Sequence, residues 1–263
     1  MKILFAKLFI LVTIILGIEY FISHQIRNGA FGINVINLSV FHLQHKSKEK
    51  HVAKVLIIGD SVGEQLYGSE IDNDTICSLA SNQGVTIAGY FFLVKNYLNV
   101  NAPKDVYLLV CPNTLQNRLS KVSYNYFLKP FYTSEYKSLM NKQLFDAIKD
   151  IPNYWMCQLP SVFSTSYTPE YEMDKVVPIS DVSASYIDSL SMLCFNKGIN
   201  FHMRLCPLRQ SVRHEVENLK KMFEKDLYKK AFSEITYLPD SCFVDGTHLK
   251  DEFVPNDYLR INE

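Results

Sequence analysis

The sequence lacks an excess of charge of either sign. Lys and Arg together number 27, Asp and Glu also number 27, and the formal net charge at pH 7 is zero. Proteins that bind nucleic acid gain much of their affinity when clustered Lys and Arg side chains displace the counterions of the phosphates. We therefore expect no nucleic-acid partner.

The sequence also lacks clustered cysteines. It has no C-x-x-C pair and no cysteine–histidine group at the spacing typical of metal ligands. We therefore expect no metal site, and no motif indicates a cofactor. If the chain lies outside the cytoplasm, one or two disulfide bonds could form, but the sequence does not say between which residues. The six cysteines are Cys77, Cys111, Cys157, Cys194, Cys206 and Cys242.

A long apolar segment is present at the N-terminus. Residues 3–22 are apolar apart from Lys7 and Glu19, which is about the length that a helix needs to cross a bilayer. No small residues at the spacing of a signal-peptidase site follow the apolar core, Leu8–Ile18. The pattern therefore predicts a retained transmembrane signal anchor over residues 1–22, and hence a single-pass membrane protein.

The charges around this segment give a weak indication of its orientation. Lys2 and Lys7 precede the apolar core, whereas His24 and Arg27 follow it, so the positive-inside rule only slightly favours a cytoplasmic N-terminus. We expect the rest of the chain on the extracytoplasmic side of the membrane. Residues 23–51 contain several Asn and Gly and the charged run HKSKEKH, which is typical of a stalk or linker.

The remaining residues, 52–263, alternate short apolar runs with longer segments of helical period. This is the pattern of β-α-β units around a mainly parallel sheet, and the runs are nearly all apolar, as in strands covered on both faces. No internal repeat is visible, so we predict one α/β domain. The predicted strands are 55–59, 75–80, 106–111 and 199–206, and the predicted helices are 85–98, 183–198 and 211–233.

Residues from about 115 to 180 form an aromatic-rich insertion after the third predicted strand, beside the carboxyl edge of the sheet. Aromatic rings in such a place can stack on sugar rings, but they serve packing far more often. The sequence leaves both roles open. The aromatic residues concerned are Tyr124, Tyr126, Tyr132, Tyr136, Tyr154, Trp155, Tyr167 and Tyr171.

A serine directly follows the first predicted strand. In VLIIGDSVGEQL, Ser61 lies at the carboxyl edge of the sheet, where open α/β folds place their ligand crevices. Gly59 and Gly63 permit a tight turn into a helix, whose first backbone N–H groups can stabilise an oxyanion. Ser61 is therefore the candidate nucleophile, although a serine hydroxyl needs a neighbouring base to take its proton.

The candidate base lies near the other end of the chain. In CFVDGTHL, Asp245 and His248 are three residues apart, so one turn of backbone can hold both side chains together. The carboxylate would then fix the imidazole tautomer and stabilise the imidazolium that forms when Ser61 attacks. Taken alone, an Asp-Gly pair more often marks an ordinary turn beside a surface histidine.

The other histidines are weaker candidates for the base. His202 lies within the fourth predicted strand and His214 lies on the last predicted helix. Three more fall in the predicted linker, where we expect them to be solvated. These are His42, His45 and His51.

The two motifs together, Gly59-Asp60-Ser61 and Asp245-x-x-His248, resemble the first and last blocks of the SGNH, or GDSL-like, hydrolase superfamily. The resemblance covers roughly residues 54–249. It implies a flavodoxin-like three-layer α/β/α domain with a central mainly parallel sheet, here preceded by one transmembrane helix. It also implies ester hydrolysis or acyl transfer through an acyl-serine.

The resemblance further implies an oxyanion hole. In the family the hole is built from the backbone N–H of the serine, here Ser61, a glycine after the second strand and an asparagine after the third. Gly84, in Ser81-Asn82-Gln83-Gly84, takes the second place. Asn113, in Cys111-Pro112-Asn113-Thr114, takes the third, but the glycine and aspartate of the family's Gly-x-Asn-Asp are missing. Asn113 either points its amide at the oxyanion or caps the following turn.

Residues 59–63 also match G-x-S-x-G, the nucleophile elbow of α/β-hydrolases. That elbow follows several strands, and its acid and histidine usually lie well apart in the sequence. Here Ser61 follows the first strand, and Asp245 and His248 are close neighbours, so the position argues against the α/β-hydrolase fold.

We therefore expect a serine esterase or O-acyltransferase that acts on acyl groups, O-acetyl above all, of cell-envelope or exopolysaccharide glycans. The expected partners are the acylated carbohydrate and the membrane. The segment Cys111-Pro112-Asn113-Thr114 matches the family's third motif only weakly, and this leaves a second hypothesis. In it the chain is a catalytically inactive accessory domain that binds glycan or scaffolds a membrane-bound acyltransferase or polysaccharide synthesis machinery. An esterase acting on phospholipid or lipoprotein is a third and weaker hypothesis.

Overall fold

Four parallel strands form the centre of the folded domain. The computed structural model describes residues 2–27, 39–116, 119, 127–150 and 179–261. Within them, the sheet has the strand order β2-β1-β3-β4, and every neighbouring pair is parallel. The predicted α/β class and mainly parallel sheet are confirmed. The strands are β1 Val55–Gly59, β2 Ile76–Ser78, β3 Asp105–Val110 and β4 Asn200–Leu205.

Strand β1 is buried along its whole length because both faces of the sheet are covered. Side chains point alternately to the two faces of a strand. Leu56 and Ile58 accordingly belong to a larger apolar cluster, whereas Val55 and Ile57 belong to a smaller one. This explains why the strand is apolar without interruption.

Two long helices pack into the larger cluster: α4, Thr86–Val100, and α10, Asp181–Asn196. Both predicted helices are confirmed, and α10 ends as expected, with Gly198 at a φ of +69°. Phe92 of α4 contacts the ring of Tyr186 on α10, and its centroid also lies 5.2 Å from that of Phe131. Helix α4 is therefore enclosed by the sheet, by α10 and by part of the insertion.

The smaller cluster joins the first helix after β1 to the C-terminal segment. This helix, α3, spans Ser61–Leu66 and contributes Val62 and Leu66. Phe243 and Leu249 pack against the same cluster from either side of the loop that carries Asp245 and His248. Burial of these apolar side chains brings the two ends of the domain together on one face of the sheet.

Gly59 and Gly63 are needed for a close approach between backbones. A Cβ atom at Gly59 would lie 2.1 Å from the carbonyl oxygen of Leu109, and one at Gly63 would lie 2.5 Å from the same atom. Neither glycine has a positive φ. Their role is therefore to let the end of β1 and the start of α3 lie directly against β3.

The predicted helix over 211–233 is wrong as a single element. The structure breaks it into the 3₁₀ turn Gln210–Val212, α11 at Arg213–Lys220 and α12 at Asp226–Ser233. Val216 and Leu219 of α11 are buried, as predicted, but the chain turns after residue 220 so that the apolar face of α12 can also reach the core. Periodicity alone does not reveal such a break.

Part of the predicted linker, 23–51, belongs to the folded domain, so that prediction is wrong for its second half. Helix α2, Ser39–Lys46, buries Val40 and Leu43 in the larger cluster. The Lys46 ammonium group donates three hydrogen bonds to backbone carbonyls around β2. A helix of eight residues with only two buried apolar side chains gives little periodic signal in the sequence, which explains the error.

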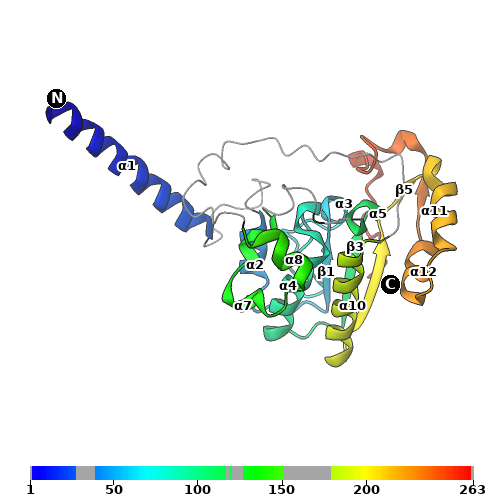
Figure 1. Cartoon of the computed structure of the whole chain (residues 1–263). Helices are drawn as coiled ribbons and strands as arrows, with labels where there is room; N and C mark the ends of the chain where they lie inside the picture. The colour runs from blue at the N-terminus through cyan, green and yellow to red at the C-terminus, as the bar shows by residue number, and fades with distance from the viewer. Residues whose placement is uncertain (1, 28–38, 117–118, 120–126, 151–178, 262–263) are drawn as a thin grey trace.

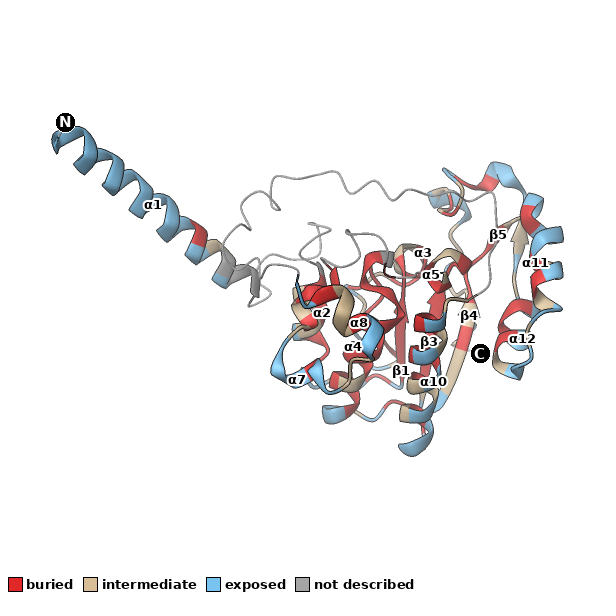
Figure 2. Cartoon of the chain, in the orientation of Figure 1, coloured by how far each residue is buried: buried red, intermediate tan, exposed pale blue. Residues whose placement is uncertain are grey.

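The first helix, α1, spans Lys2–Arg27 and extends away from the domain (Figure 1). Its segment Lys2–Ile22 is long and apolar enough to cross a membrane, and only 6% of the apolar window is buried. Figure 2 shows this helix as almost entirely exposed. Exposed Leu, Ile and Phe side chains over six turns cannot be stable in water, which is consistent with the predicted single-pass anchor.

The described aromatic residues of the insertion serve packing. Tyr136 is buried and exchanges hydrogen bonds with Asn96 of α4, and Tyr132 packs against the edge of the larger cluster. The other tyrosines named above and Trp155 lie outside the described residues.

Several short elements complete the described chain, and β5 pairs in parallel with β6 as a separate two-stranded sheet. The remaining short elements are α5 Pro112–Leu115, α7 Ser134–Lys137, α8 Lys142–Ile148, β5 Leu208–Arg209, β6 Tyr237–Leu238 and the 3₁₀ turns Gln83–Val85, Lys129–Phe131, Asp240–Cys242 and Asp251–Phe253.

The close approach at Gly59 predicts the effect of adding one methyl group. Gly59→Ala should lower the free energy of unfolding by about 1–3 kcal/mol or more, because the new Cβ overlaps a backbone carbonyl that cannot rotate away. Denaturant unfolding of the purified full chain measures this. Gly198→Asn is the control, since that site has open space and Asn tolerates a positive φ. Equal stability of the two variants would contradict the assigned role.

Candidate active site

The structure brings Ser61, His248 and Asp245 into one chain of hydrogen bonds. His248 Nε2 lies 2.9 Å from Ser61 Oγ, and His248 Nδ1 lies 2.8 Å from a carboxylate oxygen of Asp245. Because a carboxylate only accepts, Nδ1 carries the proton and Nε2 is left to accept from the serine hydroxyl. This is the tautomer that a general base needs.

The loop that holds Asp245 and His248 is organised by its own backbone. Asp245 accepts hydrogen bonds from the backbone N–H groups of Thr247 and His248, each at 2.7 Å. The N–H of Val244 donates to the carbonyl of His248 at 2.8 Å, which closes the loop. The predicted pairing of the acid and the imidazole within one turn is thus observed.

The Asp245 carboxylate is held in its charged form. Partial burial alone would raise its pKa, but hydrogen bonds from the backbone of His248 and Thr247 and from the His248 ring outweigh that effect and lower the pKa to about 2. The side chains of His248 and Asp245 are 28% and 48% exposed. The group is therefore ionised at neutral pH and accessible from solvent.

Gln65 fixes the distance between the serine helix and the histidine loop. Its side-chain amide donates to the carbonyl of Leu249 at 2.7 Å and accepts from the N–H of Leu249 at 3.0 Å. Gln65 lies one turn after Ser61 on the same face of α3, and Leu249 follows His248. One planar amide thus ties the backbone beside the candidate base to the helix of the candidate nucleophile.

Asp60 joins the loops that follow β1 and β3. It is fully buried, and one carboxylate oxygen accepts from the N–H groups of Val62 and Gly63 at the start of α3. The other oxygen accepts from the N–H of Cys111 and the hydroxyl of Thr114, each at 2.6 Å. Burial raises the pKa of Asp60, and these hydrogen bonds act in the opposite direction. Asp60 is therefore a positioning residue beneath Ser61.

The segment from Cys111 to Thr114, which contains the residue expected in the third place of the oxyanion hole, has a structural role that the sequence pattern does not reveal. Cys111 and Thr114 belong to α5 and its cap, and both bind Asp60 as just described. Asn113 lies between them, half-buried, in the loop that follows β3. Because β1 lies between β2 and β3, this loop flanks Ser61 on one side. The position of Asn113 beside Ser61 is compatible with the place expected for the third oxyanion donor.

Gly84 flanks the site on the other side, after β2. Its N–H donates to the side-chain oxygen of Asn82 at 2.8 Å. The loop is tied to β1 by a bond from the N–H of Ser81 to the carbonyl of Gly59 at 2.8 Å. A Cβ atom at Gly84 would collide with the ring of Phe127. The predicted oxyanion donor therefore has an acceptor already, and the glycine also makes room for an aromatic ring.

The alternative bases are engaged elsewhere. His202 binds Asp105 at 2.9 Å, at the amino-terminal end of β3, and its ring stacks on Tyr107. His214 is exposed on α11 and bonds to Asn218. The prediction that all three linker histidines are solvated is wrong for His51, whose side chain is only 2% exposed.

One carboxylate and two thiols gather beside the site at a spacing that could suit a metal ion. Asp60, Cys111 and Cys206 have donor atoms within 4.8 Å of one another. The two oxygens of Asp60 already accept four hydrogen bonds, so this group is a closed structural junction. The five described cysteines are free and buried, while Cys157 lies outside the described residues.

No protein-family model, no curated protein and no solved structure matches this chain.

The Gln65 amide predicts a positioning effect on His248. Gln65→Met keeps the approximate volume but leaves the N–H and carbonyl of Leu249 without partners, which should cost about 1–3 kcal/mol of unfolding free energy. The reaction of Ser61 with a fluorophosphonate should slow, because the imidazole loses its fixed distance. Gln44→Met on α2 is the control. Unchanged labelling kinetics in Gln65→Met would show that Leu249 is held by other contacts.

The lowered pKa of Asp245 predicts a pH-dependent contribution to stability. A carboxyl group whose pKa falls from 3.8 to about 2 on folding stabilises the fold above pH 3.8 and loses that contribution as the pH falls toward 2. The difference in unfolding free energy between wild type and Asp245→Asn should therefore shrink between pH 4 and pH 2. Denaturant titrations at several pH values in this range measure it. A difference that grows as the pH falls from 4 to 2 would contradict the assignment.

Proposed function

We propose that this protein is a membrane-anchored serine esterase or O-acyltransferase of the SGNH type. It would act on acyl groups, O-acetyl above all, of cell-envelope or exopolysaccharide glycans. The observation that carries the proposal is the hydrogen-bonded series Ser61–His248–Asp245, whose serine and histidine are 187 residues apart in the sequence. An ordinary turn with a surface histidine would have no reason to meet the serine after β1.

The first half of the proposed reaction forms an acyl-serine. Ser61 Oγ attacks the carbonyl carbon of the ester while His248 Nε2 takes the hydroxyl proton, and the Asp245 carboxylate stabilises the resulting imidazolium. When the tetrahedral intermediate collapses, the bond to the leaving alkoxide breaks. The imidazolium returns its proton to that alkoxide, so the sugar leaves as an alcohol.

The second half transfers the acyl group to an acceptor. His248 Nε2 takes a proton from water or from a second sugar hydroxyl, and the oxygen attacks the acyl-serine carbonyl. The imidazolium then protonates Ser61 Oγ as it leaves. Water gives hydrolysis, whereas a hydroxyl gives O-acyl transfer.

The N–H of Ser61 is the strongest candidate for an oxyanion donor. Asp60 accepts from the N–H groups of Val62 and Gly63 through its side chain and from that of Glu64 through its carbonyl. Among the described residues, the Ser61 N–H has no hydrogen-bond acceptor. The Asn113 amide, after β3, is the proposed second donor.

The fold supports the family assignment. The strand order β2-β1-β3-β4 matches the first four strands of the flavodoxin-like order, in which the crevice lies at the carboxyl edge near the first and third strands. Ser61 follows β1 and Asn113 follows β3, so both lie at that edge. We therefore propose the flavodoxin-like three-layer α/β/α arrangement for this domain.

The anchor supports the proposed location. A helix that crosses the bilayer over residues 2–22 would hold the domain at the membrane surface, and we propose that the domain faces the extracytoplasmic side. There it would meet acylated envelope glycans and membrane-bound acyltransferase or polysaccharide synthesis machinery. Phospholipid and lipoprotein esters are the alternative substrates that the same location favours.

One observation favours a second candidate function. The N–H of Gly84, expected in the oxyanion hole, already donates to Asn82. A hole with one fewer donor would weaken catalysis by about 100-fold or more. This supports an inactive SGNH-like domain that binds glycan or scaffolds a polysaccharide synthesis complex.

The decisive experiment is the reaction of Ser61. In the purified full chain, Ser61→Ala should abolish labelling by a fluorophosphonate and hydrolysis of an activated acetyl ester, because the only atom that forms the covalent bond is removed. His248→Ala should slow both by about 1,000-fold or more. Ser185→Ala, at an exposed site on α10, is the matched control and should behave as wild type.

Equal labelling of wild type and Ser61→Ala would sink the enzyme proposal. Glycan binding that survives Ser61→Ala, with no turnover of acetylated glycan by the wild type, would select the accessory function instead.

A further inference from the structure

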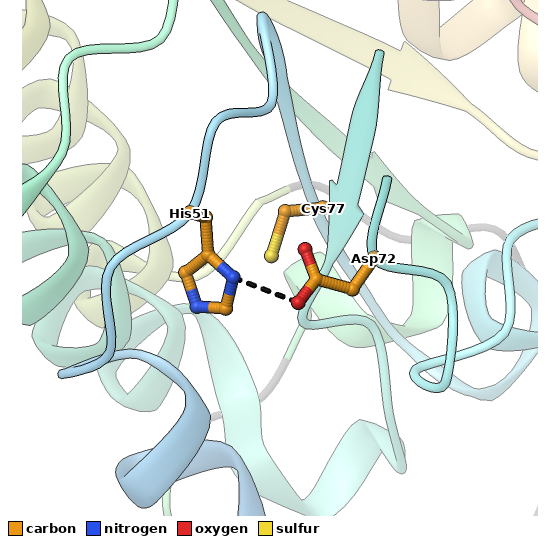
Figure 3. Close-up of side chains that lie close together, drawn as sticks. All are labelled: His51, Asp72 and Cys77. Carbon is orange, nitrogen blue, oxygen red and sulfur yellow. Dashed lines mark hydrogen bonds and ion pairs between the residues drawn. The ribbon is translucent and has the colours of Figure 1, made fainter. Parts of the chain in front are cut away.

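A second side-chain cluster lies at the opposite edge of the sheet from Ser61. It consists of His51, which precedes β1, and of Asp72 and Cys77, which flank the turn into β2 (Figure 3). One nitrogen of His51, one carboxylate oxygen of Asp72 and the sulfur of Cys77 all lie within 4.8 Å of one another. Nothing in the proposed acyl transfer uses these residues.

The backbone around this cluster is rigid. Asp72 and Cys77 face each other across an isolated antiparallel bridge, and the turn between them is closed by Asn73, whose side chain accepts two backbone N–H groups at 2.9 Å. The N–H of His51 donates to the side chain of Asn101 at 2.7 Å. The three side chains therefore start from fixed positions.

The imidazole of His51 is oriented from two sides. Its ring stacks on Tyr97, with centroids 5.4 Å apart, and Nε2 lies 2.8 Å from the carbonyl oxygen of Lys46. A carbonyl only accepts, so Nε2 carries a proton and the lone pair of the neutral ring is on Nδ1. Metal-binding histidines typically donate their second ring nitrogen to a carbonyl in this way.

The Nδ1 lone pair then faces an acceptor. Nδ1 lies 2.9 Å from Asp72 Oδ2, a contact that the dashed line in Figure 3 marks and that is an ion pair when the ring carries a second proton. Two lone pairs at this distance repel each other unless a cation lies between them. A proton would satisfy the nitrogen and the oxygen, whereas a metal ion would also bind the buried sulfur of Cys77, which is directed into the same space and contacts the Tyr97 hydroxyl.

We propose that His51, Asp72 and Cys77 bind a zinc ion. Imidazole, carboxylate and thiolate are all ligands that zinc uses, and a sulfur ligand disfavours magnesium and calcium. Zinc bonds of about 2.0–2.3 Å place tetrahedral ligand atoms about 3.3 Å apart or slightly more. The nitrogen and oxygen need to separate by only a few tenths of an ångström, and Asp72, which is 41% exposed, can move that far.

The charges of the site balance once zinc is bound. Burial raises the pKa of Cys77 to about 11, so the metal-free thiol keeps its proton and zinc must displace it. Thiolate and carboxylate together neutralise the two charges of the ion. The Lys46 ammonium, held by three carbonyls nearby, favours the thiolate, as an adjacent cation does for any cysteine. Water from the exposed Asp72 side completes the fourth position.

The inferred ion would have a structural role. His51 belongs to the segment that links α2 to β1, whereas Asp72 belongs to the turn before β2 and Cys77 to β2 itself. A metal there would fasten the N-terminal segment, next to the anchor, onto the edge of the sheet. Because Ser61 lies at the other edge, the ion would stabilise the domain without entering the acyl-transfer chemistry.

Cobalt(II) tests the site because a cobalt–thiolate bond gives a charge-transfer absorption that the other ligands do not. The purified full chain, stripped with a chelator, should bind one cobalt ion with this band, and zinc should displace it. Cys77→Ser should lose the band, and Asp72→Asn should bind cobalt at least about 10- to 100-fold more weakly. Cys194→Ser, which removes another free buried cysteine, is the matched control and should keep the band.

Three results would overturn the zinc site: no charge-transfer band in the wild type, an equal band in Cys77→Ser, or equal affinity in Asp72→Asn. Asp72→Asn keeps the proposal testable if Cys77→Ser fails to fold, because the Asp72 side chain is partly exposed. The rate of fluorophosphonate labelling at Ser61, measured with and without zinc, should stay the same, so a failed metal site and a failed enzyme proposal are distinguishable.

Discussion

The site depends on one amide that joins two distant segments. Gln65 binds both backbone groups of Leu249, and this places His248 against Ser61 although the two are 187 residues apart. The side-chain amide of Gln65 thus makes the pair of hydrogen bonds to Leu249 that a residue of a neighbouring strand would make. It can do so because α3 packs directly on β3, where two glycines leave no side chain between the backbones. Close packing and a directional hydrogen bond together define the position of the candidate base.

Asp60 performs a related task beneath the nucleophile. A buried carboxylate without hydrogen bonds would be strongly destabilising, but here four donors from two loops converge on it. The same contacts cap the serine helix and fix the loop that carries Asn113. Asp60 thus holds the start of α3 and the Asn113 loop, while Gln65, on the same helix, holds the loop of His248.

The parallel sheet places two side-chain clusters at its opposite edges. The carboxyl edge holds Ser61 and its partners, while the amino edge holds His51, Asp72 and Cys77. The spacing of metal ligands in the sequence predicts no site at the second edge. His51 falls in the predicted linker and lies 26 residues before Cys77. Only the packing of α2 onto the domain brings the histidine to the turn before β2.

The sequence by itself determined the α/β class, the four strands, helices α4 and α10, the apolar N-terminal helix and the pairing of Asp245 with His248, because these depend on local periodicity or on neighbours within one turn. Tertiary structure alone decided which histidine meets Ser61, that Thr114 and Cys111 hold Asp60, that Gly84 already has an acceptor, and that residues 39–51 are part of the domain. The break between α11 and α12 belongs to the second group. Contacts between residues far apart in the chain follow from how buried surfaces fit together, and a single sequence carries no local signal for that fit.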